Sequence, residues 1–421
     1  MSNIAVGARH ALPLQPPPKR THQRILIVLA FLFLLIVAAA LRLLIFDHYL
    51  PYIEDGNEQN MFLLTQHWRG VGADIYGYNI QYVVDWLHGY PPLYLWLNAL
   101  TQQATEALAP GQWLFAPDYF YTARLLAALF SIVTTALVVS IGWQTGGAVA
   151  GWFAGLIWAL SPIVLLEDSA AVPDPFVFFT CALSLTLALR AWTLRNPLWL
   201  FASFLAALLT ILFKYSHIYV FIPFSIVTLI FLREKPKRTL AWIALEIAVG
   251  LIAAAYLVFG YGALGVSNRE ADQFQQRGIE SVLSLDRNLN NVRMALLTFS
   301  QSPILALLTG IVVIGGIAAY ITARRGGGRV LDWRRVGLLA LYSVAGIIVT
   351  SGFSRVFEGN IRYVLPVTMA LVILWSAGAA QIIITFGRGT MHRAPTIALL
   401  TVLVSAALLP GAVSMIQQYQ L

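Results

Sequence analysis

Residues 47–97 read DHYLPYIEDGNEQNMFLLTQHWRGVGADIYGYNIQYVVDWLHGYPPLYLWL and directly follow the first long hydrophobic segment of the chain. This stretch is too polar to enter a lipid bilayer, and it contains six of the 19 acidic residues and three of the seven histidines. The rigid Pro91-Pro92 pair lies near its end. Carboxylates held where a helix leaves a membrane indicate chemistry at a boundary between water and lipid. The rest of the chain has to specify which chemistry.

The composition places this stretch in a membrane protein. The chain is 59% hydrophobic and 11% charged, with a mean hydropathy of +0.74, which no soluble class fits. The net charge of +8 does not indicate nucleic-acid binding, because Lys and Arg lie in short loops between apolar segments and no nucleic-acid-binding motif occurs. The single cysteine, Cys181, lies in an apolar segment and excludes both an intramolecular disulfide and a thiolate metal site.

Eleven hydrophobic segments are long enough to cross a bilayer as helices, which satisfy their own backbone hydrogen bonds. The expected fold is therefore an all-α polytopic membrane protein of about 11 transmembrane helices. It forms one domain over residues 25–421, with a helical first outer loop at 47–123 and a second large outer loop at 260–302. Residues 1–24 are expected to be a disordered cytoplasmic tail, and residues 91–108 an interfacial amphipathic helix. The predicted segments are 25–46 (an uncleaved signal anchor), 124–144, 148–166, 175–192, 198–213, 218–232, 240–259, 304–322, 336–350, 364–386 and 396–415.

Charge predicts the orientation of these segments. With a cytoplasmic N-terminus, 17 of the 27 basic residues fall on the cytoplasmic side, with only Glu234 and Asp332 among the acids. Every internal loop that is dense in Lys and Arg then lies on one side, as the positive-inside rule requires. The opposite, outer face of the cell membrane collects nearly all the acids and is the side on which we expect the functional site.

Glu54, Asp55 and Glu58 are the first candidates for chemistry in the outer loop. If a helix starts at Glu54, Glu58 lies one turn further on the same face. One interpretation is favourable placement of carboxylates at a helix start. The other is a general base or a ligand for a divalent metal ion, with Asp55 as the base. His88 could join such a metal site, or it could be the polar tip of an interfacial side chain.

Asp174 lies between Pro173 and Pro175 at the outer mouth of a predicted span, where it could serve chemistry, cap the helix, or do both. The nearby Glu167 and Asp168 fit ordinary interfacial charges. Lys214 lies between two apolar segments. Burying its positive charge there costs free energy unless the side chain is paired or reaches water by snorkelling.

Arg362 and Arg355, around Glu358, are basic residues on a face that otherwise gathers acids. Phosphate is the ligand that such arginines fit best.

Several stretches, in this order, resemble the membrane-embedded GT-C glycosyltransferases, in particular dolichyl-phosphate-mannose–protein mannosyltransferases and bacterial lipid A aminoarabinose transferases. The resemblance is strongest over residues 40–235. The matching features are the Glu54-Asp55 pair, PPLYLW (91–96), the Arg124-Leu125 opening of a span, GLIWALSPIVLLEDSAAVPDPFVFF (155–179), LLTILFKYSHIYVFIP (208–223) and IRYVLP (361–366).

The resemblance implies transfer of a sugar from a polyprenyl-phosphate carrier to an acceptor lipid, protein or glycan on the non-cytoplasmic side. A single displacement, with a carboxylate as general base for an acceptor hydroxyl, would invert the anomeric centre. Asp55 would correspond to the essential acid of the first loop, and Asp174 to the second acidic position. The pair reads Glu-Asp where the family usually has Asp-Glu, so Glu54 remains an alternative base. The expected donor-phosphate contacts are Lys214, Arg362 and Arg124, and the expected substrate contacts are Glu58, Tyr90 and Glu358. A divalent ion (Mg, Mn or Zn), with His88 as a ligand, is a further expectation.

Two other classes are compatible with a polytopic chain. A secondary transporter predicts ionisable residues near the middle of spans and an internal repeat. Here these residues crowd one face, Glu246 is the main exception, and no repeat is evident. A flippase of lipid-linked sugars would share the lipid-phosphate ligand. The sequence therefore favours the glycosyltransferase, with the lipid bilayer as surroundings and no nucleic-acid partner.

Overall fold

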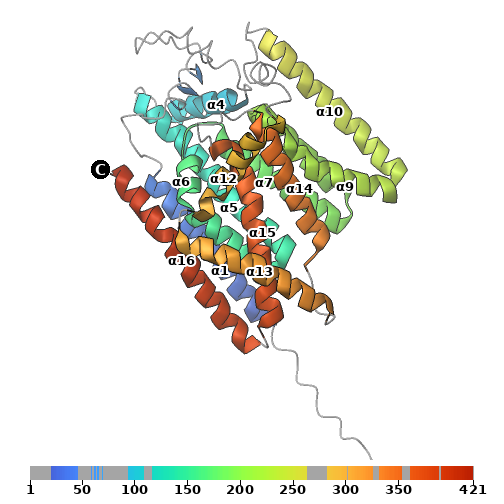
Figure 1. The fold of residues 1–421 in the computed structure, drawn as a ribbon. Helices are drawn as coiled ribbons and strands as arrows, with labels where there is room; N and C mark the ends of the chain where they lie inside the picture. The colour runs from blue at the N-terminus through green and yellow to red at the C-terminus, as the bar shows by residue number, and fades with distance from the viewer. Residues whose placement is uncertain are drawn as a thin grey trace, which may run out of the picture.

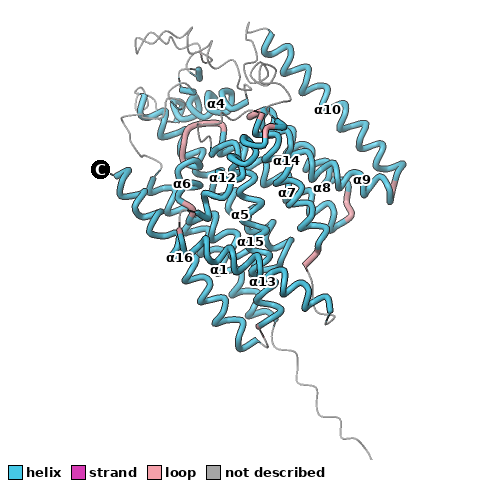
Figure 2. The backbone as a smooth tube through the Cα atoms, in the orientation of Figure 1, coloured by secondary structure: helices cyan, strands magenta, loops and turns pink. Residues whose placement is uncertain are grey.

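The computed structural model describes residues 20–45, 58, 61, 62, 64, 65, 69, 93–108, 116–262, 282–300, 302–325, 331–352, 361–387 and 390–420. All regular structure within these ranges is helical, which confirms the predicted all-α membrane fold (Figures 1 and 2). The helices, in chain order, are α1 (Arg20–Ile45), α4 (Leu93–Leu108), α5 (Ala116–Leu160), α6 (Pro162–Asp168), α7 (Asp174–Leu194), α8 (Pro197–Phe213), the 3₁₀ helix η2 (Tyr215–Val220), α9 (Phe221–Glu234), α10 (Pro236–Gly262), α12 (Leu285–Ser300), α13 (Pro303–Arg325), α14 (Trp333–Ser351), α15 (Ile361–Phe386) and α16 (Thr390–Gln420).

Nine helices of the described chain are long and apolar enough to cross a membrane, judged by length and composition. The predicted count of about eleven is therefore not confirmed. Two features account for the difference. The predicted segment 198–213 is the 17-residue helix α8, which is shorter than the nine. The predicted segment 124–144 and most of the predicted segment 148–166 lie in α5, which counts as one of the nine, and residues 162–166 belong to α6.

Helix α5 folds back on itself at Gly147, whose φ of 82° and ψ of −172° suit glycine alone. A Cβ added at Gly142 would lie 2.9 Å from the carbonyl oxygen of Ala150, and one added at Gly151 would lie 2.8 Å from that of Val139. Residues on the two sides of Gly147 therefore touch backbone to backbone, which requires two antiparallel arms. The break that the sequence predicts between residues 144 and 148 is found at this glycine.

The centre of the bundle is formed by α5, α7 and α15, which pack against one another and carry most of the fully buried apolar side chains. Helices α1, α10, α13 and α16 expose large apolar side chains along most of their length, as helices that face lipid do. Figure 1 shows α10 on the outside of the bundle and α4 lying across one end of it. This α4 matches the predicted interfacial helix over residues 91–108 and is not one of the nine apolar helices.

The bundle has two chemically different ends. We call one the site end; there α1 and α8 finish, α6 joins α7, and α15 begins. We call the other the loop end; it contains the Gly147 turn, the α7–α8 and α9–α10 connections, and the start of α14. The loop end holds the Lys- and Arg-rich connections that the sequence predicts to be cytoplasmic. The site end holds the described acids that the sequence places on the outer face.

Candidate active site

The site end is built around a buried ion pair between Asp174 and Lys214. The Lys214 ammonium Nζ donates to Asp174 Oδ1 at 2.8 Å, and each side chain is only 2% exposed. Asp174 is the first residue of α7, and no side-chain capping hydrogen bond is made there. Lys214 follows α8 with extended backbone angles (φ −162°, ψ 119°) and its N–H donates to the Thr210 carbonyl. Capping and snorkelling, the alternatives from sequence, therefore do not describe these two residues.

The start of α15 covers this pair. Lys214 Nζ lies 4.1 Å from the centre of the Tyr363 ring, at a distance typical of cation–π contacts. The His217 ring, from η2, stacks on the same tyrosine with centroids 6.3 Å apart. Arg362 Nε pairs with Glu167 Oε2 at 2.8 Å, and these side chains are 21% and 14% exposed. Arg362 also acts electrostatically on Asp174, so two of the predicted phosphate-binding cations gather around one carboxylate.

The predicted residues Glu58 and Arg124 form a second buried pair. Arg124 donates from Nε to Glu58 Oε1 at 2.9 Å and from Nη2 to Oε2 at 2.5 Å, a bidentate arrangement. The backbone N–H of Ala171 donates to the same Glu58 Oε1. Glu58 thereby ties the first outer loop to α5 and to the α6–α7 connection. The structure brings these two predicted residues together with each other, as a charge pair that is 1% exposed on both sides.

Tyr94, on α4, is a buried residue near the carboxylates of both pairs. The carboxylates of Glu58 and Asp174 both act on it, and its ring packs 5.5 Å from that of Phe176. Burial, followed by these two carboxylates, raises the pKa of Tyr94 well above its usual value, so the phenol stays protonated. Within the described residues its buried hydroxyl has no hydrogen-bond partner. Tyr94 was not among the site residues predicted from the sequence, although it lies in the PPLYLW segment (91–96).

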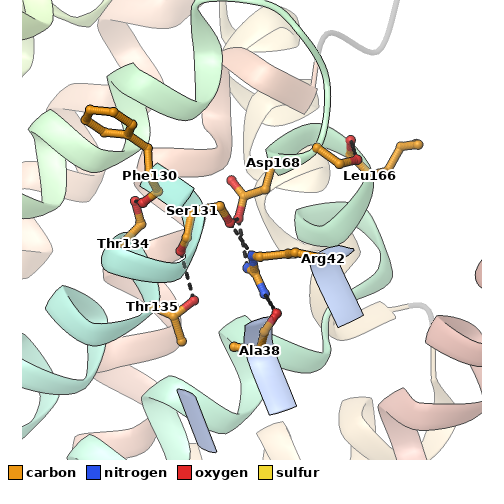
Figure 3. A network of polar contacts seen from close by, with 9 residues as sticks. Ala38, Arg42, Phe130, Ser131, Thr134, Thr135, Leu166 and Asp168 are labelled. Carbon is orange, nitrogen blue, oxygen red and sulfur yellow. Dashed lines mark hydrogen bonds and ion pairs between the residues drawn. The ribbon is translucent and has the colours of Figure 1, made fainter. Parts of the chain in front are cut away.

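A third buried pair holds α6 in place. Figure 3 shows the Arg42 guanidinium, from α1, between Ala38, Ser131 and Asp168. Arg42 Nη2 lies 2.9 Å from Asp168 Oδ2, and the Ser131 hydroxyl donates to the same oxygen. The prediction that Asp168 is an ordinary interfacial charge was wrong, because its side chain is fully buried. Burial raises the pKa of Asp168, and the Arg42 and Ser131 contacts oppose that rise. Arg42 inside an apolar segment was the sequence signal that a buried partner existed.

Five of the predicted site residues lie outside the described residues, and for them the assignments stay predictions. They are Glu54, Asp55, His88, Tyr90 and Glu358, and Arg355, the second arginine expected near phosphate, also lies outside them. No group of three or more His, Cys, Asp or Glu residues suited to a metal ion occurs in the described part of the chain. The expected metal ion therefore depends on His88 and the first-loop acids.

The fold of the chain is similar to that of solved membrane proteins. The chain matches the structure of ArnT from Cupriavidus metallidurans bound to undecaprenyl phosphate with a TM-score of 0.52 and 17% identity, over 92% of this chain and 64% of that one. It matches the oligosaccharyltransferase AglB from Archaeoglobus fulgidus, in complex with an inhibitory peptide and a dolichol-phosphate, with a TM-score of 0.52 and 12% identity, over 94% and 56% of the two chains.

The sequence model of the family described as dolichyl-phosphate-mannose-protein mannosyltransferase matches residues 112–258. No curated protein sequence matches the chain significantly. These likenesses confirm that the chain has the fold of the GT-C membrane glycosyltransferases, as its sequence predicted. The chain spans less than two thirds of the length of the ArnT and AglB chains to which it is compared.

Proposed function

We propose that this protein is a glycosyltransferase that moves a sugar from a polyprenyl-phosphate carrier to a hydroxyl acceptor on the non-cytoplasmic face of the cell membrane. The observation that carries the proposal is the buried Asp174–Lys214 pair with Arg362 beside it. This pair lies at the end of a fold shared with proteins whose structures contain undecaprenyl phosphate and dolichol-phosphate. The matched family segment, 112–258, includes both Asp174 and Lys214 and supports the same proposal.

Lys214 and Arg362 are the cations that we assign to the donor phosphate. The carrier's hydrocarbon tail stays in the bilayer, while its phosphate reaches the site end between α7, η2 and α15. Arg362 is accessible there, and a guanidinium can exchange a carboxylate partner such as Glu167 for a phosphate of similar geometry. Arg124 would first have to leave its bidentate contact with Glu58, so we give it the role of holding Glu58 in place.

The proposed reaction is a single displacement. A first-loop carboxylate, Asp55 or Glu54, removes the proton from the acceptor hydroxyl as its oxygen attacks the anomeric carbon. The bond between that carbon and the phosphate oxygen breaks, and the polyprenyl phosphate leaves with the electron pair. Lys214 and Arg362 stabilise the negative charge that builds on the leaving phosphate. One displacement inverts the anomeric centre. Asp174 keeps the Lys214 ammonium at the site, while Tyr90 and Glu358 remain proposed substrate contacts and a divalent ion near His88 remains an expectation.

The test is sugar transfer by the purified full-length protein from a panel of polyprenyl-phosphate sugars. We expect release of the carrier phosphate for at least one donor, and a loss of about 100-fold or more in Asp55→Asn if Asp55 is the general base. Glu54→Gln, measured in parallel, decides between the two first-loop acids. Asp85→Asn is the matched control, because the Asp85 carboxylate belongs to the same predicted outer loop and has no assigned role.

Two results would contradict the proposal. One is a wild-type protein that is inactive with every carrier but takes up a solute into liposomes, which would indicate a transporter. The other is movement of lipid-linked sugar across the bilayer without cleavage of the sugar–phosphate bond, which would indicate a flippase.

A further inference from the structure

A groove of about 730 Å³ opens at the loop end of the bundle, between α1, the first arm of α5, the end of α7 and the start of α14. Its apolar walls include Phe31, Leu35, Val139 and Trp143, and Trp143 is 45% exposed. Arg190 and Arg335 stand at its rim. Arg190 is 16 positions after Asp174 on α7, which at 1.5 Å per residue places it about 24 Å further along the helix. The groove is therefore separate from the candidate active site.

The two arginines at the rim are held in different ways. The Arg335 guanidinium donates to the Gln144 carbonyl and, at 3.0 Å, to Thr193 Oγ1, which fixes α14 against α5 and α7. Asp332, 43% exposed, lies 3.2 Å from Arg335 Nε and partly balances its charge. Arg190 packs over the Trp199 ring at 4.7 Å, and no acidic side chain of the described chain pairs with it.

We propose that this groove binds one anionic phospholipid, with its phosphate on Arg190 at the rim and an acyl chain along the apolar walls. Arginines at the ends of membrane helices lie at the depth of the lipid headgroups, and basic pockets between helices bind anionic headgroups. A free phosphate ion would leave the apolar walls uncovered, whereas a phospholipid satisfies both parts of the groove. Residues 1–19, which precede α1 in the sequence, contain Arg9 and Lys19 but no acid, so their charge does not complement the rim.

The experiment uses the full-length protein in nanodiscs of phosphatidylcholine, titrated with phosphatidylglycerol, with bound lipid counted by native mass spectrometry. We expect phosphatidylglycerol to bind in preference to phosphatidylcholine, and Arg190→Gln to weaken that preference by about fivefold, as expected for one arginine at a membrane surface. Arg233→Gln is the matched control, since Arg233 lies in the last turn of α9 at the same end but does not line the groove.

A second variant tests whether the apolar walls of the groove hold an acyl chain. Ala136→Phe places a ring in the groove while leaving Arg190 intact, and we expect it to reduce phosphatidylglycerol binding while the protein keeps its wild-type unfolding temperature. Glycerol phosphate, which has the headgroup but no acyl chain, should not displace the bound lipid. Equal binding of the two lipids, wild-type binding by Arg190→Gln, or displacement by glycerol phosphate would each overturn the proposal. None of these readouts depends on sugar transfer.

Discussion

Three cations at the site end are each buried in an ion pair with a carboxylate of their own. They are Arg42, Arg124 and Lys214. Moving a charge out of water is costly, so each pair tolerates its position only because both partners are present and hydrogen-bonded. The partners come from segments 40 to 126 positions apart in the chain. These pairs therefore act as fixed points that bring α1, α5, α6, α7 and the α8–η2 junction to one place.

Lys214→Met separates the structural from the chemical role of this residue. We expect the single variant to lose about 3–5 kcal/mol of stability, because the Asp174 carboxylate is left buried without its partner. The double variant Asp174→Asn/Lys214→Met removes both charges and should recover most of that stability, yet it should not recover sugar transfer. Thermal unfolding and transfer rates of the two variants check this. Recovery of transfer in the double variant would mean that Lys214 has a structural role alone.

Tyr94→Phe tests a buried residue on which the carboxylates of both site pairs act. Because its hydroxyl has no partner in the described chain, we expect its removal to change stability by less than about 1 kcal/mol. If the protonated phenol donates to a negatively charged substrate oxygen, kcat/KM should fall at least tenfold, since a hydrogen bond to a charged group contributes about 1.5–3 kcal/mol. A large drop in unfolding temperature would instead show that the hydroxyl has a structural partner.

Four charged side chains that the sequence predicted as site residues are buried in ion pairs, but the sequence did not predict how they pair. Asp174 and Lys214 were singled out as charges beside apolar segments, Glu58 as part of the acidic cluster of the first outer loop, and Arg124 through the family resemblance. Their pairing depends on how each helix is rotated about its own axis, and a single sequence does not determine that rotation. Asp168 was misjudged for the same reason, since burial of α6 comes from its neighbours and not from its own seven residues.

At the scale of elements, the α5 hairpin is the feature that depends most directly on particular residues. Glycines at 142, 147 and 151 allow the turn and the backbone contact between its arms, and the apolar runs on both sides supply two membrane-spanning lengths. The sequence predicted this break from the interruption of hydrophobicity. It did not predict that α5 begins at Ala116, eight residues before the predicted span, or that α6 is a separate short helix.

Gly151→Ala should therefore destabilise the protein by about 1–3 kcal/mol, because the added methyl group meets the Val139 carbonyl at 2.8 Å and the Trp143 amide nitrogen at 3.2 Å. Gly310→Ala is the matched control. It adds the same methyl group to a helix where nothing lies within 4 Å, and it should be neutral or stabilising by up to about 1 kcal/mol. Unfolding temperatures in one detergent provide the comparison, and equal shifts for the two variants would show that the arms of α5 are not in tight contact.

At the scale of the whole molecule, the separation of charges between the two ends makes orientation testable. The connections rich in Lys and Arg meet at the loop end, so from the positive-inside rule we expect that end to be cytoplasmic and the Asp174–Lys214 pair to lie on the outer face. Cys181, the single cysteine, is fully buried, so the wild-type chain should not react with a membrane-impermeant maleimide. New cysteines can then report on each end separately.

Leu283→Cys marks the site end, because Leu283 is 72% exposed and precedes α12, whose Asn288 bonds to Ser351 at the end of α14. Lys237→Cys marks the loop end, in the exposed first turn of α10. In intact cells we expect the maleimide to label Leu283→Cys at once and Lys237→Cys only after the membrane is permeabilised. The reverse pattern would place the paired carboxylates in the cytoplasm. The proposal that sugar transfer takes place on the outer face would then be wrong, even if the protein proved to be a glycosyltransferase.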